Sequence, residues 1–102
     1  MYKIKVEVNK DYVAVVEKFL DEKSIKYERV VRKALDFPEL IVITTELLMV
    51  IKWLYDLFTE RKNKNEDIRI NINANDININ FVEIRPEEID RKIREVETKQ
   101  EK

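Results

Sequence analysis

Residues 67–82 read Asp-Ile-Arg-Ile-Asn-Ile-Asn-Ala-Asn-Asp-Ile-Asn-Ile-Asn-Phe-Val, and this stretch decides the fold class. Apolar and polar residues alternate on both sides of a short polar segment, which is typical of two half-buried strands joined by a turn. We expect a hairpin whose loop is residues 73–76, where Asn and Asp supply the left-handed backbone that Gly usually provides. The expected cross-strand pairs are Ile72–Ile77, Ile70–Ile79 and Ile68–Phe81 on the apolar face, and Asn71–Asn78 and Arg69–Asn80 on the polar face.

The sequence before this hairpin predicts three more strands and two helices. Alternation over residues 2–8 indicates a half-buried strand, and the helical spacing that follows Asn9, an expected N-cap, indicates an amphipathic helix that ends near residues 23–24. A second strand is expected over residues 25–31. The apolar run over residues 40–44 is typical of a strand that is covered on both faces and lies near the centre of a sheet.

The second of these helices and a third, C-terminal helix complete the pattern. Thr45 is expected to cap a helix over residues 46–61, and Pro86 suits the first position of a C-terminal helix with a thin apolar stripe. Residues 97–102 are expected to fray. The order strand, helix, strand, strand, helix, strand, strand, helix predicts a single α+β domain over residues 1–102. We expect a ferredoxin-like β-α-β-β-α-β core, with an added strand that completes a C-terminal β-hairpin, and a C-terminal helix.

The composition excludes several classes of enzyme. The 102 residues include no Gly, no Cys and no His. Phosphate-cradling loops need Gly, and the commonest nucleophile–base pairs and transition-metal sites need Cys or His. We therefore expect a protein that is not an enzyme and has no catalytic residue, no metal site and no cofactor.

Residues 40–58 are apolar enough to require a test for a membrane span. Glu46, Lys52 and Asp56 lie within this stretch. Each charge costs about 2.5–3.5 kcal/mol near the bilayer centre, whereas each large aliphatic residue returns about 0.3–0.6 kcal/mol. The sequence therefore predicts no membrane span, and the start of the chain and the absence of Cys predict a cytoplasmic protein.

The expected helix over residues 46–61 has more apolar surface than one sheet needs. It can be simply the central core helix, or part of it can pack on a second copy or on another protein. Aromatic residues often anchor such contacts. The candidate partner or dimer contacts are Trp53, Tyr55 and Leu57.

Two basic clusters make nucleic-acid binding the alternative function. One cluster surrounds the expected second strand and the other follows the expected helix over residues 46–61. The chain carries 20 basic and 21 acidic residues, and acidic residues are interleaved throughout, so a solvated surface of mixed charge is the simpler interpretation. The polar face of the expected hairpin also lacks the aromatic residues on which single-stranded bases stack. The candidate nucleic-acid contacts are Lys26, Arg29, Arg32, Lys33, Arg61, Lys62, Lys64 and Arg69.

A metal-dependent hydrolase or nuclease is the third possibility. Carboxylates at turns and strand ends could in principle hold Mg²⁺. The residues concerned are Asp36, Glu39, Asp67 and Asp76, and their spacing matches no known signature.

The bias toward Ile, Lys, Asn and Glu, with stretches such as Ile-Arg-Ile-Asn-Ile-Asn at residues 68–73, resembles small orphan proteins of filamentous viruses that infect hyperthermophilic archaea. The stretch Trp-Leu-Tyr-Asp-Leu at residues 53–57, which precedes the expected hairpin, is also similar to small accessory modules of bacterial conflict systems. Both resemblances imply an intracellular accessory protein, in the host cytoplasm if it is viral, whose partner is a host factor. The sequence thus predicts a small protein that self-associates as a dimer and binds a macromolecular partner.

Overall fold

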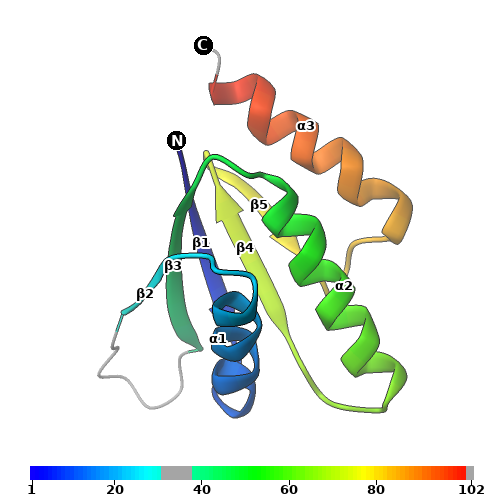
Figure 1. The fold of residues 1–102 in the computed structure, drawn as a ribbon. Helices are drawn as coiled ribbons and strands as arrows, with labels where there is room; N and C mark the ends of the chain where they lie inside the picture. Colours follow the sequence, from blue (N-terminus) through cyan, green and yellow to red (C-terminus); the bar gives the residue numbers. More distant parts are fainter. Residues whose placement is uncertain (31–37, 101–102) are drawn as a thin grey trace.

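The structure is a computed structural model that describes residues 1–30 and 38–100, and this part of the chain forms an α+β fold. Five strands make one antiparallel sheet in the order β2-β3-β1-β4-β5 (Figure 1). The strands are β1 (Tyr2–Val8), β2 (Tyr27–Val30), β3 (Glu39–Thr45), β4 (Ile70–Ala74) and β5 (Ile77–Asn80). The helices are α1 (Val13–Glu22), α2 (Met49–Asn63) and α3 (Ile89–Gln100), and single 3₁₀ turns at Lys10–Tyr12 and Pro86–Glu88 precede α1 and α3.

Strand β1 is the centre of the sheet. It pairs with β3 on one side and with β4 on the other, so that Val6 lies between Ile41 and Ile72. The side chains of Ile4, Val6 and Val8 point to one face and are 0% exposed. Helices α1 and α2 cover that face (Figure 1). The alternation over residues 2–8 therefore predicted this strand correctly.

Helix α3 packs beside α2, near β5. Its stripe faces inward, with Ile89 and Val96 buried and Ile93 half-buried. The amide of Asn75, in the β4–β5 turn, donates a hydrogen bond of 2.9 Å to the carbonyl of Val96. These contacts fix α3 to the hairpin.

The opposite face of the sheet carries no helix among the described residues. Strand β3 lies near the centre of the sheet, between β2 and β1, as residues 40–44 predict. The expectation that it is covered on both faces is wrong, because its Leu40 and Val42 side chains stay partly exposed on this face. The physical reason is the chain path. The crossovers β1-α1-β2 and β3-α2-β4 have one hand, so they bring both helices to the same face.

The β4–β5 turn is two residues long, not four, and the expected pairs of the hairpin are therefore wrong. Ile72 lies opposite Ile79, and Ala74 lies opposite Ile77. Asn75 and Asp76, with φ of 51° and 64°, form the turn. Positive φ at both turn residues matches the twist of the strands and lets the ladder continue two residues further. A shift of two residues keeps every side chain on its face, so the apolar and polar faces remain as expected.

Asn9 does not cap α1, contrary to expectation. Its side chain makes no cap hydrogen bond, and α1 begins only at Val13. The Asn9 amide instead donates to the Asp67 carbonyl at 2.8 Å and accepts from the Arg69 backbone N–H at 2.8 Å. It thereby continues the β1–β4 pairing beyond the end of β1, and its side chain is directed to β4 and not to the first turn of the helix.

At the ends of α1 and α2, Ser and Asn adopt the left-handed backbone conformation that Gly usually adopts there. Ser24, after α1, has φ of 57°, and Asn65, after α2, has φ of 62°. The Ile25 N–H then donates to the Leu20 carbonyl at 2.9 Å, which satisfies one of the last carbonyls of α1. A chain without Gly thus ends its helices with small or polar residues.

Helix α2 begins at Met49, three residues later than expected. Thr45 Oγ1 accepts the Leu47 N–H at 3.0 Å and so stabilises the turn before the helix. Residues 46–48 are therefore outside α2. No helix in the described part of the chain is both long enough and apolar enough to cross a membrane.

We expect Asp76→Gly to stabilise the protein. Gly takes positive φ without the steric cost that a side chain adds, so the free energy of unfolding should rise by about 0.5–1 kcal/mol. The measurement is the midpoint of urea unfolding, followed by circular dichroism. Asp76→Ala is the matched control and should lower the midpoint, because Ala cannot form the local hydrogen bonds that help Asp adopt this conformation. An unchanged or lower midpoint for Asp76→Gly would contradict the role assigned to the turn.

Candidate functional site

A groove of about 630 Å³ runs between α1 and α2 on the helical side of the molecule. Both helices lie on the same face of the sheet (Figure 1). The groove is apolar at its base and charged along its rims. Its lining residues are Ala14, Val15, Lys18, Phe19, Glu22, Lys23, Trp53, Asp56, Leu57, Glu60 and Arg61.

The helical repeat explains which side chains reach the groove. In α1, Val16 and Leu20 are buried against the sheet, and their neighbours Val15 and Phe19 project sideways and stay half-buried. In α2, Trp53 lies one turn before Leu57, so the two share the side that faces α1. Leu57 is 8% exposed. The base of the groove is therefore made by the core residue Leu57 and by half-buried side chains that pack against the edge of the core.

Lys23 lies over the aromatic end of the groove. Its ammonium nitrogen is 5.4 Å from the ring centroid of Trp53 and 5.7 Å from that of Phe19. A cation over an aromatic face at this distance contributes about 0.5–1 kcal/mol where water has access. This contact ties the end of α1 to the first half of α2, so the two helices run antiparallel along the groove.

The two rims carry opposite charge. The α1 rim has Lys18 and Lys23 with one acid, Glu22, and the α2 rim has Asp56 and Glu60 with one base, Arg61. Arg61 is already paired with Glu66, with 3.3 Å between Nη1 and Oε1. Glu60 pairs only with the exposed Lys64, at 3.5 Å. Within the described part of the chain, Lys18, Glu22 and Asp56 form no ion pair.

The structure brings two of the three candidate partner contacts together. Trp53 and Leu57 line the groove. Tyr55 lies on a different side of α2, where its ring meets Phe81 edge-on at 5.2 Å between centroids and stacks on Phe58 at 6.1 Å. Tyr55 therefore packs against the core next to the hairpin.

Sequence reasoning missed the contribution of α1 to this groove. The helical spacing that follows Asn9 predicts only an amphipathic helix, so it gives Val15 and Phe19 no role beyond its apolar stripe. The available signal was their spacing, because they flank the fully buried Val16 and Leu20 on one side. They line a groove only because α2 packs beside α1, and the periodicity of α1 gives no information about where α2 lies.

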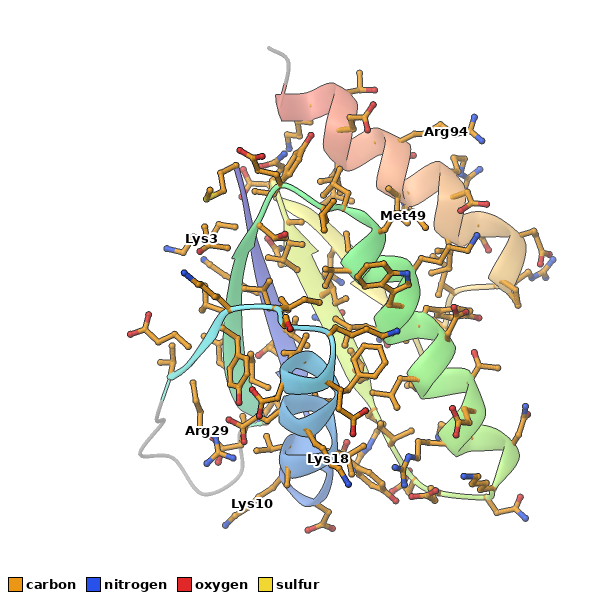
Figure 2. The ribbon with its side chains drawn as sticks, viewed as in Figure 1. Lys3, Lys10, Lys18, Arg29, Met49 and Arg94 are labelled. Atoms are coloured by element: carbon orange, nitrogen blue, oxygen red, sulfur yellow. The ribbon has the colours of Figure 1, made fainter. Side chains whose placement is uncertain are left out.

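Most of the candidate nucleic-acid contacts are neutralised by neighbouring carboxylates. Arg29 pairs with Glu17 at 2.8 Å, and Figure 2 shows it on the side of α1 away from Lys18. Lys62 and Arg69 both pair with Asp67, at 3.9 and 3.8 Å, and Arg61 and Lys64 have the partners given above. Lys26 is exposed and, among described residues, without an ion pair. Arg32 and Lys33 lie outside the described residues.

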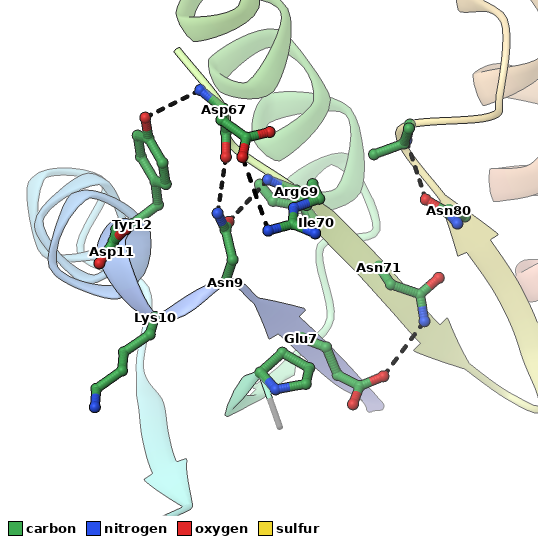
Figure 3. A pocket seen from close by; sticks show the side chains of 12 residues that line it. Glu7, Asn9, Lys10, Asp11, Tyr12, Asp67, Arg69, Ile70, Asn71 and Asn80 are labelled. Carbon is green, nitrogen blue, oxygen red and sulfur yellow. Dashed lines mark hydrogen bonds and ion pairs between the residues drawn. The ribbon is translucent and has the colours of Figure 1, made fainter. Parts of the chain in front are cut away.

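A second hollow, of about 610 Å³, lies where β1 ends and β4 begins (Figure 3). Its polar groups are largely engaged with one another: Tyr12 Oη accepts the Asp67 N–H at 3.1 Å, and Asn71 Nδ2 donates to Glu7 at 3.4 Å. Asn9 bridges the same segments. The hollow is therefore explained by hydrogen bonds that hold β1 to β4, although Asn71 Oδ1 is buried there with no partner.

The carboxylates do not form a metal site in the described part of the chain. No group of three or more acidic side chains there is close enough to hold a metal ion. Asp36 lies outside the described residues.

Among the residues that the structure describes, one titratable group has a clearly shifted pKa. Burial raises the pKa of the Tyr27 hydroxyl above its usual value, and the negative charges of Asp21 and Glu17 raise it further. The hydroxyl also donates a hydrogen bond of 3.4 Å to Asp21. The contacts join β2 to the outer side of α1, away from the groove.

No family model, no curated protein and no solved structure matches the chain. The features of the chain that bear on its function are therefore the geometry of the groove and the charges around it.

We expect the protein to bind single-stranded DNA only weakly, with a dissociation constant above about 100 µM at physiological salt, where nonspecific DNA-binding proteins reach about 1–100 µM. The reason is the pairing of its basic side chains with carboxylates. Fluorescence anisotropy of a labelled oligonucleotide measures the affinity.

Asp67→Asn is the informative control for DNA binding. It removes the carboxylate that pairs with Lys62 and Arg69, so the affinity should rise and become more dependent on salt. Micromolar binding by the unmodified protein, with a steep dependence on salt, would contradict the expectation.

Proposed function

We propose that the protein is a small non-enzymatic binding module that associates with another protein through the groove between α1 and α2. The observation that carries the proposal is the half-buried Trp53, which shares an apolar groove with Leu57, Val15 and Phe19. An isolated domain gains little by leaving an indole ring half-exposed. Trp is enriched at the centre of protein interfaces, where a ring of polar residues excludes water around it.

The charged rims support a protein partner over a polyanion. The α1 rim has an excess of basic side chains and the α2 rim an excess of acidic ones, and a nucleic acid would meet the acidic rim at Asp56 and Glu60. A protein partner can present both charges. The composition supports a role without catalysis, because Gly, Cys and His are absent from the chain.

We also infer that β1, α1, β2, β3, α2 and β4 form a ferredoxin-like core, to which β5 and α3 are added. In support of this inference, β1 lies between β3 and β4, β2 lies outside β3, and both crossovers skip one strand. The fold carries no function of its own, since many unrelated activities use it. Its relevance here is that it places two helices side by side on one face.

We further propose that the module is an intracellular accessory protein with a host factor as partner. This proposal rests on the resemblance in composition to small proteins of archaeal filamentous viruses. It would explain a chain that offers a binding surface with few residues suited to catalysis.

The test uses a photo-reactive benzoylphenylalanine at one of two exposed positions, Ala14 in the groove or Thr44 on the opposite face of the sheet. We expect the Ala14 probe to give a discrete cross-linked product in cells and the Thr44 probe to give none. Trp53→Ala in the Ala14-labelled chain should reduce that product at least about tenfold, because a central aromatic anchor contributes about 2 kcal/mol or more.

Mass spectrometry identifies the cross-linked product, and circular dichroism verifies that each variant is folded. Products that form from Thr44 and not from Ala14, or that persist unchanged in Trp53→Ala, would overturn the proposed function.

A further inference from the structure

We propose that the occupant of the groove is a second copy of this chain, related to the first by a two-fold axis that runs along the groove. This inference rests on the proposed function, because it names the partner of the same site. It is carried by the charge of the two rims together with the antiparallel course of α1 and α2.

The rims are complementary to each other. Lys18 and Lys23 give the α1 rim an excess of positive charge, and Asp56 and Glu60 give the α2 rim an excess of negative charge. Lys18 and Asp56 form no ion pair with any described residue of their own chain. A surface with opposite charge on its two halves is complementary to a rotated copy of itself, which is the requirement of a two-fold interface.

The charges also select the direction of the axis. Two copies that meet face to face have their two-fold axis in the plane of contact. An axis across the groove would set α1 against α1 and bring Lys18 near its own equivalent. An axis along the groove sets α1 of each copy against α2 of the other, so that each basic rim meets an acidic one.

A two-fold axis along the groove places each residue of α1 opposite the residue of α2 in the other copy that lies at the same height along the groove. The heights of Lys18 and Asp56 agree with this arrangement. Lys23 contacts Trp53, so these two residues mark one level. With a rise of about 1.5 Å per residue, Lys18 lies about 7.5 Å below that level on α1, and Asp56 lies about 4.5 Å below it on α2. The heights differ by about 3 Å, which the length of a Lys side chain can span.

The apolar base of the groove fits the same arrangement. Rotation about this axis brings Trp53 of each copy toward the Phe19 end of α1 in the other copy. The aromatic rings of the two copies then meet at one end of the groove, at the level of Lys23 and Trp53, and the charged side chains of the rims continue along the rest of the groove. Aromatic residues are enriched in protein interfaces, and charged and polar residues in the rim around them.

The test is a pair of charge reversals, Lys18→Glu and Asp56→Lys, both at exposed positions. Sedimentation equilibrium should show a dimer for the unmodified protein. Each variant alone should dimerise at least about tenfold more weakly, because like charges then face each other twice across the axis. An equimolar mixture of the two variants should recover the affinity of the unmodified protein, because every rim contact in the mixed dimer again joins opposite charges.

Trp53 is the only Trp of the chain, so its fluorescence gives a second readout. Acrylamide quenching should decrease as the unmodified protein is concentrated, and it should stay constant for each single variant over the same range. Lys5→Glu, on the opposite face of the sheet, is the matched control and should behave like the unmodified protein.

Two results would overturn the inference. A protein that stays monomeric up to about 500 µM has no self-association of biological use. A mixture of the two variants that remains monomeric while the unmodified protein dimerises would exclude the axis along the groove. Cross-linking from Ala14 to a different protein would still support the proposed function in either case, so the two proposals can fail separately.

Discussion

Strand β1 is the element on which the rest of the structure depends, because both of its edges are paired and one whole face is buried. Each of Ile4, Val6 and Val8 lies opposite an apolar residue of β4. On the other edge, Ile4 and Val6 also lie opposite an Ile of β3. A strand in that position fixes the register of both neighbours, since a slip by one residue would expose its entire apolar face. These three side chains therefore lie at the centre of the core formed by the described residues.

The groove is a consequence of covering one sheet face with two helices. Each helix buries its own stripe against the strands, Val16 and Leu20 from α1 and Ile51 and Leu54 from α2. The side chains next to these stripes then face each other across the gap, where neither helix can cover them fully. Trp53 is large enough to reach into this gap, and Lys23 covers it only at the edge.

Several of the exposed charges are paired within the chain, and three charges without an ion pair among the described residues, Lys18, Glu22 and Asp56, line the groove. Exposed ion pairs such as Glu60–Lys64 contribute little to stability, about 0–1 kcal/mol each, but they neutralise the field of the basic residues. A site for polyanions is difficult to build on such a surface. A pair of rims with opposite excess charge can instead orient a protein partner, which is where electrostatics contributes most to an interface.

The sequence by itself determined the order of the elements, the apolar and polar faces of the hairpin and the stripe of α3, because periods of 2 and 3.6 residues are local properties of the chain. Tertiary structure decided the length of the β4–β5 turn, the use of Asn9 as a partner of β4 instead of a cap, and the exposure of one face of β3. It also placed Phe19 beside Trp53. Each of these outcomes depends on which segments meet across the sheet, and a repeat within one segment carries no information about its neighbour.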